Sequence, residues 1–278
     1  MTVGSILKSV LRPVREAALA AATYPRGVRR SVNGMTFRVD SRTRFSFAPI
    51  YDAGVTQVLM ATLKPRDECW NIGANVGVHV LQMCSRVGPT GQIVAFEPNP
   101  YAAALLQRNV TLNAYSGRVS IVQAAIGEYI GTTEFYIAGS DPMGRPQRPN
   151  PLLHRTTCLQ VPVFTLDHFL AQRGRSPRCL VMDIEGWEIG ALLGAQGLLQ
   201  LEPLPLLIVE LHPDAWSWSG HSREQLVHLM ESSKLELLPL SGQVDVLAEH
   251  GQALLQRAET PNASLQQTSP AHSRGCRH

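Results

Sequence analysis

Four side chains that can accept protons or hydrogen bonds stand where apolar runs of this sequence end. They are Glu97, Asp183, Glu210 and His212. Short apolar runs are typical of buried strands, and parallel α/β sheets bind ligands at the carboxyl ends of their strands. We therefore expect these groups to lie at one edge of a sheet, where they could bind a ligand and where His212 could act as a base.

The segment 182–188 reads MDIEGWE, so Glu185 and Glu188 follow Asp183 closely. Both fall in the turn and first helical turn after the strand, where carboxylates also complement the helix dipole. His212 likewise fits two roles, a structural histidine or a base beside the site. The residue types alone leave these alternatives open.

A strand, a glycine turn and a helix are predicted to precede Glu97. The apolar run 69–72 ends in Gly73-Ala74-Asn75-Val76-Gly77, and apolar residues then recur at roughly helical spacing through Val87. Glycines at such a turn let backbone N–H groups at the helix start face a nucleotide or an amino-acid carboxylate. The extra glycine of the dinucleotide fingerprint is missing, which favours a nucleoside with a small charged tail, such as S-adenosylmethionine.

Glu97 lies 20 residues after Gly77, at the tip of the second predicted strand. At this separation an acid can accept hydrogen bonds from both ribose hydroxyls of a nucleoside. A third strand over 119–123 ends in small residues, which would let an adenine ring slide between strand ends near Gln123 or Ala124.

Composition sets the broad class of the protein. The chain has 278 residues, 44% of them hydrophobic and 17% charged, and a formal charge of +3 with a pI near 8.7. One main α/β domain is the default, and an extended nucleic-acid footprint is not indicated. Five scattered cysteines without C-x-x-C spacing favour reduced thiols in the cytoplasm over a disulfide frame or a zinc site. No apolar run approaches the ~20 residues of a membrane-spanning helix.

We expect an N-terminal helical and hairpin extension over residues 1–50, a main domain over 51–250 and a disordered tail over 251–278. The N-terminal helix either packs on its own domain or contacts a membrane surface peripherally. The segment 139–156 is expected to be a substrate-facing lid. The other expected elements are a hairpin over 32–47 turning at 33–34 or 40–41, helices over 51–63, 101–112, 166–171, 188–199 and 222–233, strands over 132–137, 159–163, 178–184 and 206–209, and a closing hairpin of 235–238 with 244–247.

The motifs NIGANVG, AFEPNP, TLDHF, MDIEGWE and IVELHP, in this order, resemble the FkbM family of S-adenosylmethionine-dependent methyltransferases. The resemblance implies the class I methyltransferase fold, a Rossmann-like, seven-stranded and mostly parallel sheet with helices on both faces. It also implies O-methylation of a sugar, glycan or natural product. By motif, the cofactor contacts would include Gly73, Ala74, Asn75, Gly77, Glu97 and Asn99, and Asp183 and Glu185 would lie beside the transferred methyl.

This chain departs from the family pattern at two positions, Asn71 in place of Asp and Met182 in place of Lys. Asn71 can still hydrogen-bond, so we expect it to support cofactor binding. Our hypothesis is that His212 or Asp183 is the base and that Glu185 and Glu210 fix substrate hydroxyls, with no metal. The two rival hypotheses are a catalytically degenerate cofactor binder and an NAD-type oxidoreductase. A nucleic-acid methyltransferase ranks after both. The sequence identifies neither the acceptor nor the oligomeric state.

Overall fold

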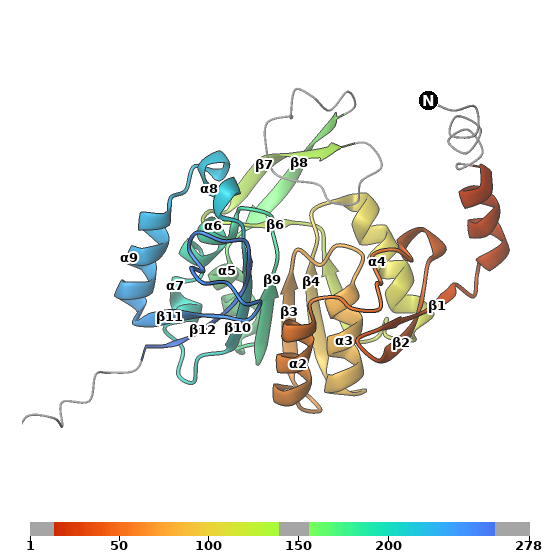
Figure 1. Cartoon of the computed structure of the whole chain (residues 1–278), viewed down its shortest axis with the longest axis horizontal. Coiled ribbons are helices and arrows are strands. Elements are labelled where there is room, and N and C mark those ends of the chain that lie inside the picture. The colour runs from red at the N-terminus through yellow and green to blue at the C-terminus, as the bar shows by residue number, and fades with distance from the viewer. Residues whose placement is uncertain (1–13, 139–155, 259–278) are drawn as a thin grey trace, which may run out of the picture.

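A seven-stranded sheet forms the centre of the molecule in a computed structural model, which describes residues 14–138 and 156–258 (Figure 1). In spatial order its strands are β11 (Leu235–Pro239), β12 (Gly251–Arg257), β10 (Leu206–Leu211), β9 (Cys179–Met182), β3 (Glu68–Ile72), β4 (Gln92–Phe96) and β5 (Val119–Val122). The strands from β10 to β5 pair in parallel, and β12 runs antiparallel to both of its neighbours. The predicted seven-stranded, mostly parallel sheet is confirmed.

Alternate side chains of the central strands enter two separate hydrophobic cores, one on each face of the sheet. In β3, for example, Cys69 packs into one core, while Trp70 and Ile72 pack into the other. Successive side chains of a strand point to opposite faces, so a strand covered on both faces is apolar throughout. The first core holds α2 (Ala53–Thr62), α3 (Val78–Val87) and α4 (Pro100–Leu112), and the second holds α5 (Leu166–Arg173), α6 (Glu188–Leu193), α7 (Gln196–Leu199), α8 (Pro213–Ser219) and α9 (Arg223–Ser233).

A second, three-stranded sheet lies beyond the carboxyl ends of the central strands (Figure 1). It consists of β6 (Ala125–Ile126), β8 (Thr156–Phe164) and β7 (Gly131–Ala138), in that order. The strands predicted at 132–137 and 159–163 are therefore confirmed, and they pair with each other. The proposed lid segment lies almost wholly outside the described residues.

The N-terminal part of the chain supplies a helix and a hairpin at one side of the domain. Residues 14–23 are helical and bury no side chain, and Glu16 pairs with Arg44 at 2.8 Å. The hairpin of β1 (Val28–Val32) and β2 (Met35–Val39) turns at Asn33 and Gly34, which both have positive φ, as expected of a tight hairpin turn. A short 3-10 helix, η1 (Ser41–Thr43), follows.

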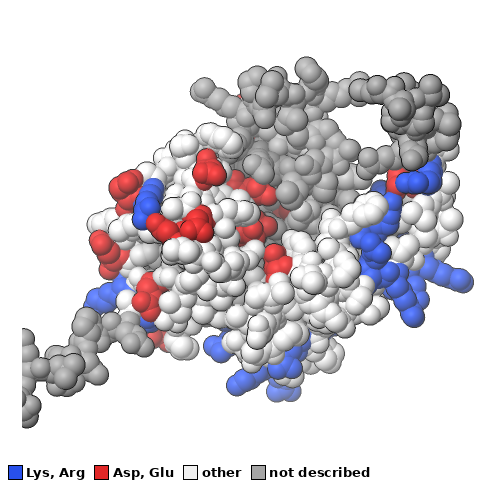
Figure 2. Space-filling view, in the orientation of Figure 1, with Lys and Arg blue, Asp and Glu red and all other residues white. Residues whose placement is uncertain are grey.

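Basic and acidic side chains gather on different parts of the face shown in Figure 2. Basic residues lie mainly along the side formed by the N-terminal helix and the β1–β2 hairpin, whereas acidic residues lie over the centre and the opposite half. The segment 14–45 holds seven arginines against two acids, Glu16 and Asp40. None of the helices within residues 14–138 and 156–258 combines the length and apolar character needed to cross a bilayer.

The expected C-terminal organisation was wrong. Strand β11 pairs with β12, not with 244–247, and β12 lies inside the sheet between β10 and β11. Residues 251–257 are therefore a strand and not part of a disordered tail, and residues 259–278 lie outside the described residues. Gly251, Ala253 and Leu255 alternate toward the interior, but the alternation is short and interrupted by glutamines. The sequence of this segment therefore looks like that of a polar tail, and only its pairing in the sheet makes it a strand.

Candidate functional site

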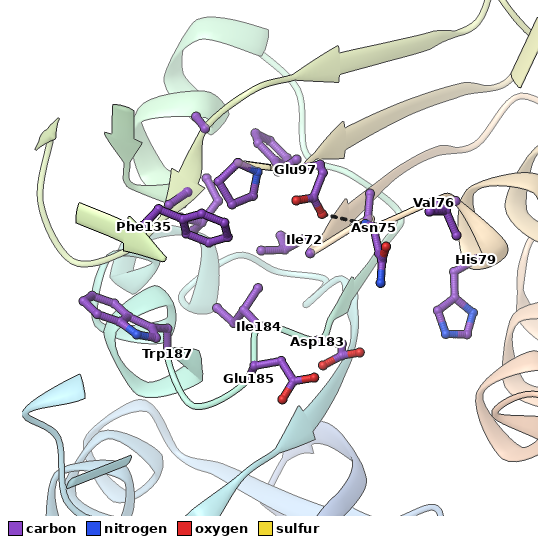
Figure 3. Close-up of a pocket in the computed structure, with 18 of the residues that line it drawn as sticks. Ile72, Asn75, Val76, His79, Glu97, Phe135, Asp183, Ile184, Glu185 and Trp187 are labelled. Carbon is purple, nitrogen blue, oxygen red and sulfur yellow. Dashed lines mark hydrogen bonds between the residues drawn. The ribbon is translucent and has the colours of Figure 1, made fainter. Parts of the chain in front are cut away.

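A cavity opens at the carboxyl ends of β3, β4 and β9, beneath the three-stranded sheet (Figure 3). Together with the open space at its mouth it spans about 960 Å³. The glycine turn lines one part of it, and Asp183 and Glu185 line another. The cavity thus joins the two chemical motifs that lie about a hundred residues apart in the sequence.

The glycine turn needs its glycines for both conformation and space. Gly73 and Gly77 have φ values of +76° and +94°, in the left-handed region. A Cβ on Gly73 would lie 1.8 Å from the backbone oxygen of Asp183, and one on Gly77 would lie 2.3 Å from Leu106 Cδ1. The turn therefore packs directly against the strand end that carries the acidic motif.

Two features of this turn fit a ligand with a polar, charged tail. Helix α3 starts after Gly77 without a side-chain cap, so its first N–H groups can serve an anionic group. The Oδ1 atom of Asn75 is buried and has no hydrogen-bond partner among the described residues. Since buried polar atoms are normally paired, this atom indicates a bound polar partner. Gly73, Ala74, Asn75 and Gly77 all line the cavity, and their contact with a cofactor stays a prediction.

Glu97 lies at the end of β4 with its side chain in the cavity wall. One carboxylate oxygen accepts the backbone N–H of Asn75 at 2.7 Å and the other accepts that of Asn99 at 2.8 Å. Each oxygen can still accept a further hydrogen bond, so the carboxylate remains able to bind ribose hydroxyls. Burial raises the pKa of Glu97 to about 7, although the two N–H groups oppose the rise.

Three predicted cofactor residues lie outside the cavity lining. Asn71 is buried and donates from Nδ2 to the Val181 carbonyl at 3.2 Å, which joins β3 to β9. Asn99 caps α4 by accepting the Tyr101 N–H at 3.0 Å. Gln123 is exposed, whereas Ala124 next to it is buried and does line the cavity. Asn71 and Asn99 thus bond to the backbone of β9 and α4 beside the cavity, and a cofactor contact of Asn71, Asn99 or Gln123 stays a prediction.

Several lining residues were not identified from the sequence. They are Ser46, Tyr51, His79, Phe135, Val163, Ile184 and Trp187. Most come from segments outside the motifs, and only tertiary packing brings them to the strand ends. Alternation in 132–137 could have shown that Phe135 faces inward, since it is 2% exposed between the exposed Glu134 and the half-buried Tyr136.

Asp183, Glu185 and His212 lie together, as predicted. The Nε2 atom of His212 is 3.6 Å from Glu185 and 3.9 Å from Asp183. The Oδ1 atom of Asp183 is shielded from solvent and has no hydrogen-bond partner in the described part of the chain, although the side chain as a whole is 30% exposed. Burial and the charge of Glu210 raise the pKa of Asp183 well above its ordinary value.

Glu188 holds His212 in place. It is fully buried, and its carboxylate accepts from His212 Nδ1 at 2.9 Å, from the Gly186 N–H at 2.7 Å and from Trp216 Nε1 at 3.0 Å. Burial disfavours the imidazolium, but the hydrogen bond and charge of Glu188, followed by the other acids, raise the pKa of His212 to about 9. Glu188 therefore does more than complement a helix dipole.

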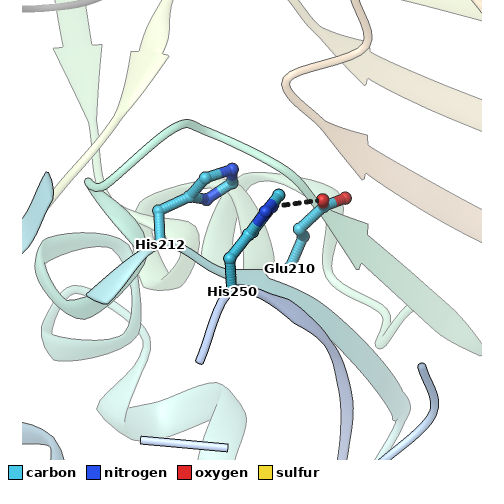
Figure 4. Close-up of side chains that lie close together, drawn as sticks. All are labelled: Glu210, His212 and His250. Carbon is cyan, nitrogen blue, oxygen red and sulfur yellow. Dashed lines mark hydrogen bonds and ion pairs between the residues drawn. The ribbon is translucent and has the colours of Figure 1, made fainter. Parts of the chain in front are cut away.

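Glu210 does not join the cavity lining, although its strand end is next to Asp183. Its carboxylate contacts His250 at 2.8 Å and Gln252 at 3.1 Å, both from the C-terminal segment (Figure 4). Two overlapping groups have the side-chain types of a metal site, Asp183 with Glu185 and His212, and Glu210 with His212 and His250.

Residues 71–236 match the methyltransferase FkbM domain family. Among solved structures, a methyltransferase FkbM from Methylobacillus flagellatus is 16% identical, with a TM-score of 0.42 over 72% of this chain and 50% of its own. Aeropyrum pernix fibrillarin in complex with S-adenosyl-L-methionine is 12% identical, with a TM-score of 0.44 over 84% of each chain. A Streptococcus thermophilus rRNA methylase is 9% identical, with a TM-score of 0.45 over 74% of this chain and 95% of its own. No curated protein matches the sequence.

Proposed function

This chain belongs to the methyltransferase FkbM family, and from that premise we propose that it transfers a methyl group from S-adenosylmethionine to a hydroxyl oxygen of a sugar, glycan or natural product. One observation carries the proposal. A single cavity holds a nucleoside-type cradle at one part and the carboxylates of Asp183 and Glu185 at another. Such a cavity can bring an acceptor hydroxyl to a cofactor and a base at once.

The cofactor half of the cavity provides three kinds of contact. The uncapped start of α3 binds a carboxylate, the orphaned Asn75 Oδ1 accepts a hydrogen bond, and Glu97 accepts the ribose hydroxyls. Ala124 has a small side chain, and together with the apolar lining residues beside it provides an apolar surface on which an adenine ring can lie. When bound there, S-adenosylmethionine supplies an electrophilic methyl group.

In the acceptor half of the cavity, a side chain must remove the proton of the acceptor hydroxyl. We assign that role to Asp183, because its Oδ1 atom lacks a hydrogen-bond partner in the described chain and its carboxylate faces the cavity (Figure 3). The acceptor hydroxyl gives its proton to this carboxylate, and Glu185 positions the acceptor by a hydrogen bond. His212, held by Glu188, lies 3.6 Å from Glu185 and 3.9 Å from Asp183, so its positive charge stabilises both carboxylates.

The two departures from the family pattern lie outside the cavity. Asn71 bonds to the Val181 carbonyl, and Met182 is 1% exposed within the second hydrophobic core. Because neither side chain reaches the cavity lining, this placement supports an active enzyme over a degenerate cofactor binder. We place the reaction in the cytoplasm, where the cofactor is supplied.

The first experiment is a calorimetric titration with S-adenosylmethionine, S-adenosylhomocysteine and NAD, on the native protein and on Glu97→Ala. We expect micromolar binding of the first two, about −8 kcal/mol, a large loss in the variant and no heat from NAD. A well-folded protein that binds neither sulfur compound would refute the enzyme. Binding of NAD alone would favour the oxidoreductase.

The second experiment is an acceptor screen over sugars, natural products and a structured RNA. Once an acceptor is found, Asp183→Asn should lower kcat by about a hundredfold or more and leave cofactor affinity within a few-fold. The matched control is Asp214→Asn, an exposed acid of α8, which should retain native turnover. Full turnover by Asp183→Asn would remove it as the base, and methylation of RNA alone would overturn the proposed acceptor class.

A further inference from the structure

Glu210, His212 and His250 form a cluster beside the cavity, and methyl transfer as proposed above uses only His212 of the three (Figure 4). Glu210 lies near the end of β10 and His212 directly follows that strand, while His250 is the residue before β12. One potential ligand atom from each residue lies within 4.8 Å of those of the other two. The two imidazole rings stack at a centroid distance of 4.5 Å.

Each member of this cluster is already oriented by a partner. Glu188 accepts from Nδ1 of His212, so Nε2, on the side away from Glu188, is the atom that can bind a metal ion once it releases its proton. Gln252 donates to one oxygen of Glu210, and the other oxygen meets His250 Nε2 at 2.8 Å. A carboxylate behind a histidine is the arrangement that fixes the tautomer of metal-binding histidines.

The charge of the region favours a cation. In the part of the chain that the structure describes, Asp183, Glu188 and Glu210 form ion pairs with histidines and with no lysine or arginine. Asp183 Oδ1 is also buried without a hydrogen-bond partner there. A divalent ion next to these groups would offset their mutual repulsion.

We infer that Glu210, His212 and His250 bind one divalent transition-metal ion, of which Zn²⁺ is the best fit. Two imidazole nitrogens and one carboxylate oxygen suit Zn²⁺ far better than Mg²⁺, which prefers oxygen ligands. His250 is 59% exposed, so the site is open to solvent on one side and can complete its coordination with water. The ion fastens the chain before β12 to the end of β10 and fixes His212 beside the cavity.

The test is a calorimetric titration of chelator-treated, dialysed full-length protein with Zn²⁺ and, separately, with Mg²⁺. We expect one equivalent of Zn²⁺ to bind, with Mg²⁺ weaker by about a hundredfold or more. His250→Ala and Glu210→Ala should each weaken Zn²⁺ binding by about tenfold or more, because a ligand is lost. His228→Ala, which removes an exposed histidine on α9, is the matched control and should bind like the native protein.

A thermal melt of each variant shows that it is folded, and the S-adenosylmethionine titration is repeated on His250→Ala. Retained cofactor binding with lost Zn²⁺ binding supports the metal site, and it does so whether or not any acceptor is methylated. Zn²⁺ binding that survives in His250→Ala, or no stoichiometric binding by the folded native protein, would overturn the assignment. Loss of Zn²⁺ binding in Asp183→Asn but not in His250→Ala would move the ion to the other group and overturn it as well.

Discussion

Glu97 combines a binding task with an unfavourable environment. The residue is 5% exposed, so its ionised form loses most of its hydration, and within the described residues two backbone N–H groups replace that water. Burial therefore raises its pKa to about 7. Ribose hydroxyls that donate to the carboxylate would add the hydrogen bonds that the free protein lacks, which couples cofactor binding to ionisation.

This coupling predicts the pH dependence of cofactor affinity. Donated hydrogen bonds favour the ionised carboxylate, so protonation of Glu97 competes with binding. With a pKa of about 7, the dissociation constant for S-adenosylhomocysteine should rise about tenfold from pH 8 to pH 6. Calorimetry at both pH values measures this. Glu97→Gln should bind weakly with a smaller pH dependence, which also reports the ligand's own ionisation; an equal dependence in both proteins would contradict the prediction.

At the scale of the element, the glycine turn couples cofactor and acid. The Gly73 N–H donates to the Phe96 carbonyl at 3.0 Å, and the turn touches the backbone of Asp183. Strands β4, β3 and β9 thus meet at this one turn. Any group larger than hydrogen on Gly73 must push the strand ends apart.

Two alanine substitutions separate conformation from space. Gly73 and Gly34 have similar φ values, +76° and +81°, but a Cβ on Gly34 would meet nothing within 4 Å. Gly34→Ala should lower the free energy of unfolding by about 1 kcal/mol and leave cofactor affinity unchanged. Gly73→Ala should cost clearly more and weaken cofactor binding at least about tenfold, because it displaces Asp183. Urea denaturation and calorimetry measure both, and equal effects of the two substitutions would contradict the steric argument.

The side chains on the two faces of strand β12 differ in how deeply they are buried. Leu255 is 2% exposed and packs in the second core, whereas its neighbour Gln256 bonds to Glu236 near the surface. Leu255→Ala should lower the free energy of unfolding by about 2–5 kcal/mol through lost burial and a cavity. Gln256→Ala should cost less than about 1.5 kcal/mol. Similar losses in urea denaturation would mean that β12 does not hold this register.

At the scale of the whole molecule, the cavity is built from distant parts of one domain. The lining comes from the loop before α2, the glycine turn, the ends of β4 and β9, and the three-stranded sheet. Both cores share the central strands, so the two faces of the sheet should unfold together. The arginine-rich side in Figure 2 includes the β1–β2 hairpin. The carboxylates of the cavity, Asp183 and Glu185, lie on other elements.

Cofactor binding should therefore stabilise the whole domain. A ligand at a hundred times its dissociation constant adds about 2.7 kcal/mol to the free energy of unfolding. For a domain of this size the melting temperature should rise by about 5–10 °C, in a single transition. Differential scanning calorimetry with S-adenosylhomocysteine tests this, and Glu97→Ala should show little shift. Two transitions, only one of which responds, would contradict a single cooperative unit.

The sequence by itself determined the local units and the edge at which the chemistry lies. The strand, glycine turn and helix of 69–87 and the Asn33-Gly34 hairpin turn are confirmed, because periodicity and glycine conformation act between near neighbours. The polar groups at strand ends share an edge because parallel strands all point the same way.

Only the tertiary structure decided which of those groups meet. Glu210 contacts His250 and Gln252 because β12 pairs with β10 in the sheet. Asn71 donates a hydrogen bond to the Val181 carbonyl and does not line the cavity. Glu188 becomes the partner of His212 because α6 packs against the end of β10. A local pattern states which face a residue takes. It does not state which distant strand supplies its neighbour, since that depends on the packing of the entire sheet.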